Sequence, residues 1–192
     1  MVNSINPKFI AFDIDGVFAD TMTLFLDIAR DEYNIQGIKY EDIKSYFIEE
    51  CTNIEPQIIE EILLKLVNGN YKGTLKPING APEVIIKIAK NHSPILFVTA
   101  RHDVAHIYDW LFQVLPLAKQ SVEVVATGSF EAKTDVLKDK NIHFFVEDRV
   151  ETCFNLDKAG ITPIVFKQPW NRVEHPFVEV GTWAEIELML KF

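Results

Sequence analysis

The chain has 192 residues, 48% of them hydrophobic, which is enough for one domain with a full core and a small insertion. Its formal net charge of -9 argues against a nucleic acid polymer as a partner, because the overall field repels phosphate backbones. The sequence has no apolar leader and no run of about 18 to 20 apolar residues. We therefore expect a soluble, cytoplasmic protein that does not bind membranes, and two cysteines without metal-ligand spacing agree with a reducing compartment.

Five short apolar runs predict β-strands. They are rich in β-branched and aromatic residues, and several are nearly continuous, which is typical of strands covered on both faces. Helical patterns separate several of these runs, and strand-helix alternation predicts an α/β fold with a doubly wound parallel sheet. The expected strands span residues 9–13, 94–100, 122–128, 143–148 and 162–167, and the expected core helices span 81–91, 103–113 and 149–159.

Residues 20–76 interrupt this alternation. They contain no strand signal but several helical patterns, and glycines at 69 and 73 followed by residues 77–80 mark the return to the core. We expect a small helical cap inserted after the first strand and lying over the carboxyl edge of the sheet. The predicted domains are a catalytic core of residues 1–19 and 77–192 and a cap of residues 20–76. The expected cap helices are 23–34, 40–50 and 56–69.

The first expected strand ends in an unusual polar group. Asp13 and Asp15 are separated by one residue and followed by Gly16. Parallel sheets bind ligands at the carboxyl ends of their strands, where these residues would lie. A turn at Gly16 can bring the side chain of one aspartate and the backbone carbonyl of the other onto one hard cation. A solvated Asp-Gly turn is the structural alternative.

Other strand ends carry residues that suit the same chemistry. Thr99 follows the second strand, and its hydroxyl and the N–H of Ala100 could hold the oxygens of an anion. Lys133 starts an expected helix after the third strand, and Glu147 with Asp148 end the fourth. Each residue alone could be a helix cap or a solvated surface charge. Together they predict one rim of carboxylates, a hydroxyl and a lysine.

Phosphoryl transfer uses such a set of groups, because its catalysis depends on positioning and on charge stabilisation. Asp13 can be the nucleophile, forming an aspartyl-phosphate. Asp15 can protonate the leaving oxygen and then accept a proton from water. Mg²⁺ would take oxygens from Asp13, the Asp15 carbonyl and Asp148. Lys133 would balance the negative charge, and Thr99 would hold the phosphoryl group.

The order of "DIDGV", "FVTAR", Lys133 and "FVEDR" resembles the four motifs of the haloacid dehalogenase-like superfamily of phosphohydrolases. The resemblance implies a Rossmann-like core from about residue 9 to residue 170, with the first strand in the middle and a cap directly after the first motif. An aspartate at position 15 is similar to the phosphatase and phosphomutase pattern, and dehalogenases lack it.

Two further stretches, "DIDGVFAD" and "KQPWNR" (167–172), resemble the cytosolic 5'(3')-deoxyribonucleotidase group and its bacterial relatives. This resemblance implies a small phosphomonoester substrate, most simply a (deoxy)nucleoside monophosphate. Thr21 stands where this group often has an aromatic residue, and Glu147 replaces the first of two aspartates. We therefore assign the metal to Asp148 and place Glu147 behind the ligands. Aromatic residues that could replace the missing one are Phe18, Phe25, Tyr46 and Phe47.

Several alternatives stay open from the sequence. A sugar-phosphate phosphatase or a phosphomutase would use the same first half-reaction, and a non-catalytic protein that binds phosphoanions would use the same fold. Arg101 and His102 follow Thr99 and could approach a phosphate. The base preference and a homodimeric state are also open. The tryptophans are expected in packing roles rather than as a substrate platform.

Overall fold

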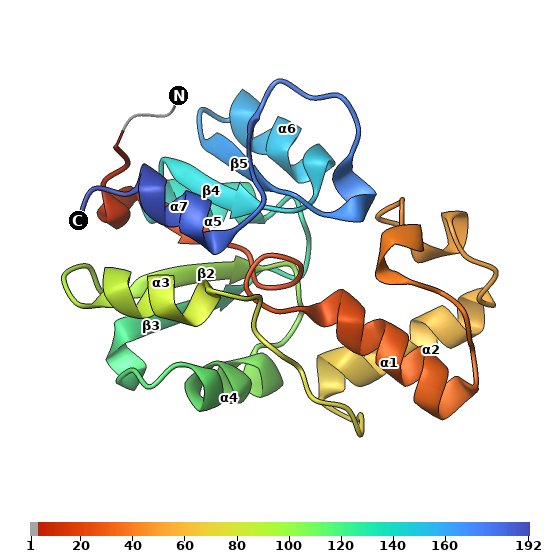
Figure 1. Ribbon diagram of the computed structural model, residues 1–192. Coiled ribbons are helices and arrows are strands. Elements are labelled where there is room, and N and C mark those ends of the chain that lie inside the picture. The colour runs from red at the N-terminus through yellow and green to blue at the C-terminus, as the bar shows by residue number, and fades with distance from the viewer. Residues whose placement is uncertain (1–3) are drawn as a thin grey trace.

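The computed structural model describes residues 4–192 and contains a six-stranded parallel sheet in the order β3-β2-β1-β4-β5-β6 (Figure 1). The predicted α/β fold is confirmed, and the first strand lies in the middle of the sheet. All five expected strands are present, with ends shifted by at most two residues. The strands are β1 Ile10–Phe12, β2 Ile95–Thr99, β3 Val122–Ala126, β4 Phe144–Glu147, β5 Thr162–Phe166 and β6 Val178–Val180.

Helices cover both faces of the sheet, and two more lie beyond its carboxyl edge (Figure 1). The three core helices expected from the sequence are present as α3, α4 and α6. Within residues 4–192, no helix has both the length and the apolar character that crossing a membrane requires. The helices are α1 Thr21–Tyr33, α2 Pro56–Asn68, α3 Ala81–Ala89, α4 Ala105–Val114, α5 Lys133–Asp139, α6 Val150–Lys158 and α7 Trp183–Met189.

The alternation of side chains along β1 divides the core into two layers. Ile10 and Phe12 contact the layer that includes α3, α4 and α7, whereas Ala11 contacts the layer that includes α5 and α6. The completely buried Trp183 packs on Phe12 with ring centroids 5.2 Å apart. Its Nε1 donates a hydrogen bond of 2.9 Å to the carbonyl oxygen of Val17, so the indole also supports the loop after β1.

Strand β6 and helix α7 were not expected from the sequence. β6 has only three residues, and the central one is Glu179, so it has neither the length nor the apolar content of a strand signal. Helix α7 begins at a capping box in which Thr182 Oγ1 accepts from the N–H of Glu185 and Glu185 Oε2 accepts from the N–H of Thr182. Pairing with β5 orders β6, which local pattern does not reveal.

The helix expected at residues 40–50 was wrong. This stretch forms two short 3-10 turns, Tyr40–Asp42 and Ile48–Glu50. Between them, the Ser45 hydroxyl accepts from the N–H of Phe47 at 3.2 Å and donates to Glu50 at 2.5 Å. Such local side-chain bonds compete with a continuous helix.

Two connecting stretches, which lie side by side, join the helical segment (residues 21–68) to the core. The N–H of Asp20 donates to the carbonyl of Lys76 at 2.9 Å, and the N–H of Ile78 donates to the carbonyl of Phe18 at 2.8 Å. The two ends of the segment are therefore held together at the edge of the sheet. The exact division into a core and a cap at residues 20 and 76 stays a prediction.

Candidate active site

The loop after β1 is a tight turn that carries both aspartates. The Ile14 carbonyl accepts hydrogen bonds from the N–H groups of the three residues at 17–19, which closes the turn. Gly16 has φ +72°, and a Cβ atom there would lie 2.1 Å from Asp148 Oδ2. Only glycine allows both this conformation and this close approach. The turn therefore brings the backbone next to the carboxylate that ends β4.

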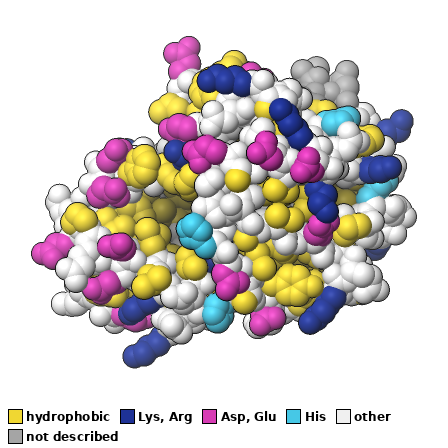
Figure 2. All heavy atoms as spheres, turned by 180° about the vertical axis from the view of Figure 1, so that it is seen from behind, with side chains coloured by type: hydrophobic (Ala, Val, Ile, Leu, Met, Phe, Trp, Pro, Cys, Tyr) yellow, Lys and Arg dark blue, Asp and Glu magenta, His cyan; other side chains and the backbone are white. Residues whose placement is uncertain are grey.

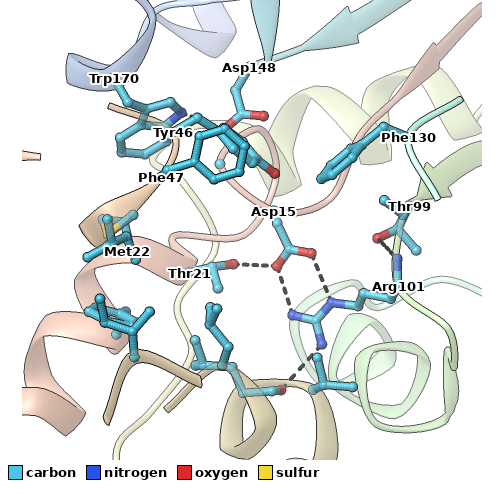
Figure 3. Close-up of a pocket in the computed structure, with 18 of the residues that line it drawn as sticks. Asp15, Thr21, Met22, Tyr46, Phe47, Thr99, Arg101, Phe130, Asp148 and Trp170 are labelled. Atoms are coloured by element: carbon cyan, nitrogen blue, oxygen red, sulfur yellow. Dashed lines mark hydrogen bonds and ion pairs between the residues drawn. The ribbon is translucent and has the colours of Figure 1, made fainter. Parts of the chain in front are cut away.

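A cavity of about 720 Å³ lies between the carboxyl edge of the sheet and the helical segment. Figure 2 shows it as a hollow lined by hydrophobic side chains, and Figure 3 shows the residues around it. Asp13, Thr99 and Asp148 line its inner end and form what we call the floor. The helical segment lines the opposite wall, where Glu49 and Glu60 stand among apolar side chains. We call these apolar side chains the roof; they are Met22, Phe25, Tyr46, Phe47, Ile48, Pro56, Ile59, Leu63, Leu66 and Val67.

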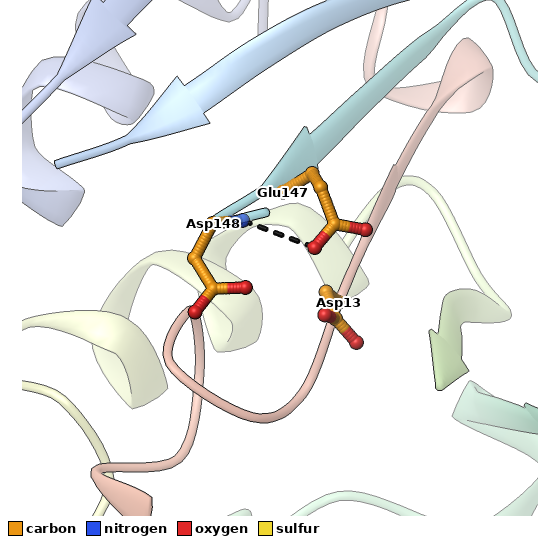
Figure 4. Close-up of side chains that lie close together, drawn as sticks. All are labelled: Asp13, Glu147 and Asp148. Atoms are coloured by element: carbon orange, nitrogen blue, oxygen red, sulfur yellow. Dashed lines mark hydrogen bonds between the residues drawn. The ribbon is translucent and has the colours of Figure 1, made fainter. Parts of the chain in front are cut away.

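Three buried carboxyl groups gather at the floor: Asp13, Glu147 and Asp148 (Figure 4). One oxygen of each lies within 4.8 Å of the others. Lys133, which is completely buried at the start of α5, places its Nζ 2.9 Å from Asp13 Oδ2 and 2.8 Å from Glu147 Oε2. The cluster thus contains three carboxyl groups and one ammonium group, so its net charge is negative when all of them are ionised.

This imbalance perturbs the carboxyl groups. Burial raises the pKa of Asp13 well above its ordinary value; Lys133 opposes the rise, and Glu147 adds to it. Burial likewise raises the pKa of Asp148, with further contributions from Glu147 and Asp13. A divalent cation at this point would favour the ionised carboxylates and remove the imbalance.

The hydrogen bonds show which oxygens are available to a cation. Glu147 uses both of its oxygens, because Oε1 accepts from the N–H groups of Asp148 and Arg149 and Oε2 accepts from Lys133. Asp13 also uses both, since Oδ1 accepts from the N–H of Ile14 at 2.7 Å and Oδ2 pairs with Lys133, but Asp13 lines the cavity and Glu147 does not. Asp148 uses Oδ2 to accept from Trp170 Nε1 at 2.9 Å. Among the described residues, no hydrogen bond reaches the carbonyl oxygen of Asp15. Asp13, Asp148 and this carbonyl form an all-oxygen donor set of the kind that Mg²⁺ prefers.

The "KQPWNR" stretch supports the floor from below. Gln168 Nε2 donates to the Gly16 carbonyl at 2.6 Å, and Asn171 Nδ2 donates to the Asp148 carbonyl at 2.8 Å. Together with Trp170, these side chains hold the loop after β1 against the end of β4. The sequence linked this stretch to a family but missed the bond from Trp170 to Asp148, which no local signal could reveal.

The end of β2 supplies the other expected groups. Thr99 is buried, and its Oγ1 accepts from the N–H of Arg101 at 3.3 Å. Thr99 and Ala100 both line the cavity beside Asp13. Lys133 and Glu147 lie behind Asp13, within the protein, and are not among the lining residues. The structure thus brings the expected polar groups of the strand ends together around Asp13.

Asp15 has a partner that the sequence did not predict. Arg101 donates to both of its oxygens, from Nε at 2.9 Å and from Nη2 at 2.7 Å, and the Thr21 hydroxyl donates at 2.6 Å (Figure 3). Burial by itself would raise the pKa of Asp15, but the Arg101 guanidinium and these hydrogen bonds lower it below its usual value. The two residues are 86 positions apart in the sequence.

Aromatic side chains stand above the floor. The Arg149 guanidinium lies 4.3 Å from the ring centroid of Phe130 and 5.1 Å from that of Tyr46. Of the aromatic candidates from the sequence, Phe25, Tyr46 and Phe47 line the cavity. Phe18 does not, because it packs in the core against Phe97, Trp110 and Trp183.

The parallel sheet and its acidic carboxyl edge are those of a haloacid dehalogenase-like phosphatase, and the protein is an enzyme of this class. The model of the family described as "5' nucleotidase, deoxy (Pyrimidine), cytosolic type C protein" matches residues 7–192. The chain belongs to this family.

Individual relatives are distant but match along nearly the whole chain. A 5'(3')-deoxyribonucleotidase of Bacillus subtilis is 26% identical over 186 residues, covering 95% of this chain and 98% of the relative. A nucleotidase of Clostridium acetobutylicum is 24% identical over 184 residues, covering 92% and 90%.

Solved structures confirm the fold. A haloacid dehalogenase-like family hydrolase from Streptococcus pneumoniae superposes with a TM-score of 0.60 at 11% identity, covering 92% of this chain and 95% of that chain. A hydrolase of the same superfamily from Ehrlichia chaffeensis has a TM-score of 0.51 at 16% identity and covers 96% of both chains. At these identities, the likeness concerns the fold alone.

Proposed function

We propose that this protein is a Mg²⁺-dependent phosphomonoesterase that hydrolyses (deoxy)nucleoside monophosphates through an aspartyl-phosphate. The observation that carries the proposal is the placement of Asp13 at the floor of an apolar cavity, 2.9 Å from the Lys133 ammonium and within the same acidic cluster as Asp148. The printed names of the family and of its relatives, which refer to deoxynucleotides and nucleotidases, support the choice of substrate.

The donor set fits Mg²⁺. Asp13, Asp148 and the carbonyl of Asp15 would hold the ion, and Glu147, which does not line the cavity, would stay behind them. When bound, the ion supplies positive charge to the oxygens of the transferring phosphoryl group. Lys133 supplies a second positive charge from beneath Asp13.

The reaction follows from the positions of the chain's own groups. Asp13 Oδ attacks phosphorus and forms the aspartyl-phosphate as the bond from phosphorus to the ester oxygen breaks. Asp15, in its protonated form, gives its proton to that leaving oxygen and becomes the carboxylate. In the second half-reaction, water attacks phosphorus, Asp15 takes its proton, and Asp13 and inorganic phosphate are released. The Thr99 hydroxyl and the Ala100 N–H hold the phosphoryl oxygens.

The roof suits an uncharged, partly aromatic leaving group such as a nucleoside. Phe25, Tyr46 and Phe47 offer aromatic faces to a base. The other roof side chains are apolar and not aromatic. In this proposal residues 20–76 act as a cap that keeps stray water from the aspartyl-phosphate. A cytoplasmic location agrees with the family's description as cytosolic.

The test is phosphate release from a panel of deoxynucleoside monophosphates, sugar phosphates and p-nitrophenyl phosphate, with Mg²⁺ and with a chelator. We expect the nucleotides to be preferred and the chelator to abolish turnover. Asp13→Asn should lower turnover of every substrate by about 10⁴-fold or more, because it removes the nucleophile. Its circular dichroism spectrum should match that of the wild type.

Asp139→Asn is the control, since this carboxylate is exposed at the end of α5. It should leave turnover unchanged. Wild-type turnover by Asp13→Asn would refute the nucleophile assignment. Isomerisation of a sugar phosphate without phosphate release would identify a mutase, and tight binding of the panel without turnover would identify a phosphoanion-binding protein.

A further inference from the structure

Tyr40 connects the helical segment to the stretch that supports the floor. Its hydroxyl donates a hydrogen bond of 2.7 Å to Gln168 Oε1, and its ring centroid lies 5.7 Å from that of Trp170. Tyr40 and Gln168 are 128 positions apart in the sequence, so this contact joins two separate parts of the fold. Tyr40 therefore contacts two of the side chains by which the "KQPWNR" stretch holds the floor.

The side-chain amide of Gln168 fits its two partners in one orientation. A backbone carbonyl accepts hydrogen bonds and cannot donate them, so Nε2 faces the Gly16 carbonyl, which it reaches at 2.6 Å. Oε1 then faces Tyr40, whose hydroxyl is the donor. Gln168 is only 7% exposed. Removal of the Tyr40 hydroxyl would therefore take from a buried acceptor the hydrogen bond that satisfies it.

Gln168 and Trp170 hold two sides of the place where a cation would bind. Gln168 fixes the Gly16 carbonyl, which belongs to the next peptide unit after the Asp15 carbonyl. Trp170 Nε1 donates to Asp148 Oδ2 at 2.9 Å. The Asp15 carbonyl and Asp148 are two of the oxygen donors assigned to Mg²⁺. Because Mg²⁺ requires nearly ideal octahedral geometry, a small shift of either support would weaken its binding.

The stretch around Tyr40 depends on such contacts for its placement. Residues 39–51 form two 3-10 turns joined by irregular backbone, which has few internal hydrogen bonds to hold it. This stretch also meets the core at Tyr46, a roof residue whose ring centroid lies 5.6 Å from that of Phe130 and 5.1 Å from the Arg149 guanidinium. The contacts of Tyr40 thus link a part of the roof to the supports of the floor.

We propose that Tyr40 is a positioning residue that couples the seating of residues 39–51 on the core to the binding of a divalent cation at the floor. The inference rests on the proposed function, from which it takes the Mg²⁺ site. Tyr40 is not among the residues that line the cavity, so its hydroxyl acts through Gln168 and the loop after β1. Coupling of this kind is reciprocal, so the cation in turn holds residues 39–51 more firmly on the core.

The first experiment measures the Kd of MgCl2 for the full chain by isothermal titration calorimetry. Tyr40→Phe keeps the ring beside Trp170 and removes only the hydroxyl. We expect its Kd to rise about fivefold, which corresponds to the net contribution of one hydrogen bond. Tyr33→Phe is the matched control, because it makes the same change in the same segment, where the hydroxyl donates to the exposed Glu61 at 3.0 Å. Its Kd should equal that of the wild type.

Gln168→Met tests whether the effect passes through the amide. It removes both bonds of the side chain, so its Kd should rise more than that of Tyr40→Phe. Adding Tyr40→Phe to Gln168→Met should raise the Kd no further, since residues that act through one contact are not additive. Saturating Mg²⁺ should return phosphate release by Tyr40→Phe to the wild-type rate, which it would not do if the hydroxyl served only the stability of the fold.

The reciprocal effect is measured by hydrogen–deuterium exchange. Mg²⁺ should slow exchange of the backbone amides in residues 39–51 of the wild type, and should slow it less in Tyr40→Phe.

An unchanged Kd in Tyr40→Phe would overturn the inference and leave the proposed function standing. Losses that add in the double variant would also overturn it, because the hydroxyl would then act independently of Gln168. So would exchange in residues 39–51 of the wild type that does not respond to Mg²⁺. A wild-type protein that binds no Mg²⁺ would instead refute the proposed function, and the inference would fall with it.

Discussion

The floor and the roof of the cavity are built in opposite ways. At the floor, Asp13 and Asp148 are each 5% exposed; Asp13 pairs with Lys133 at the start of α5, and Asp148 accepts a hydrogen bond from Trp170. In the roof, Leu63 and Phe47 are 46% and 49% exposed and present apolar side chains. The buried polar groups of the floor need partners of fixed geometry because water is absent there, whereas exposed apolar side chains of the roof have no such requirement. We infer that the floor sets the chemistry and the roof sets the choice of leaving group.

Among the tests of this comparison, the largest effect is expected when the Lys133 ammonium beneath the floor is removed. Lys133→Met leaves Asp13 and Glu147 facing each other without the ammonium that lies within 2.9 Å of both. Phosphate release from a nucleoside monophosphate should fall by about 10³-fold. The free energy of unfolding should fall by about 3 kcal/mol, because a buried charge pair is broken. Urea unfolding and a phosphate assay would measure the two effects.

Lys138→Met is the matched control for this experiment. Lys138 lies on the same helix but is exposed. Its removal should leave both activity and stability within experimental error of the wild type. An active Lys133→Met protein would show that the ammonium is not needed to balance the charge at Asp13.

A smaller effect of opposite sign is expected from Asp148→Asn without metal. Burial raises the folded-state pKa of Asp148, so stability is lost as the pH rises through that value and the buried carboxyl must ionise. In a chelator at about pH 8, the variant should therefore be more stable by about 1 kcal/mol, or about 3 °C in Tm. The asparagine can still accept the bond from Trp170.

Thermal unfolding with and without Mg²⁺ checks this prediction. Mg²⁺ should raise the Tm of the wild type and leave that of Asp148→Asn unchanged. As the pH falls toward about pH 5, the difference between the two proteins in chelator should shrink, since the wild-type carboxyl takes up a proton. A variant that is less stable than the wild type at every pH would contradict the inference that the ionised Asp148 carboxylate destabilises the metal-free protein.

The smallest effect is expected in the roof, where two adjacent leucines form a natural comparison. Leu63 lines the cavity, whereas Leu64 is 60% exposed on α2 and is not among the lining residues. Leu63→Ser should raise KM for a nucleoside monophosphate about fivefold, which corresponds to about 1 kcal/mol of lost apolar contact. Leu64→Ser should leave it unchanged. Inhibition by inorganic phosphate, which we assign to the floor, should be the same in both; equal KM changes would remove the distinction between the two faces.

Local sequence pattern was sufficient for most of the floor. Apolar runs identify buried strands, and polar residues that directly follow them must lie at one edge when the strands are parallel. This reasoning placed Asp13, Thr99 and Asp148 together without any knowledge of their contacts. It failed for β6, which is too short to show a pattern of alternating apolar residues. It also failed for residues 40–50, where local hydrogen bonds interrupt the expected helix.

The chain alone determined which groups stand at the carboxyl edge, because alternation and strand direction are properties of consecutive residues. Only the tertiary structure decided how those groups are paired. The bond from Trp170 to Asp148 spans 22 positions, and the pair of Arg101 with Asp15 spans 86. The burial of Lys133 between two carboxylates likewise depends on how α5 packs beneath the sheet edge. Such pairs depend on the path of the whole backbone, which no short stretch of sequence contains.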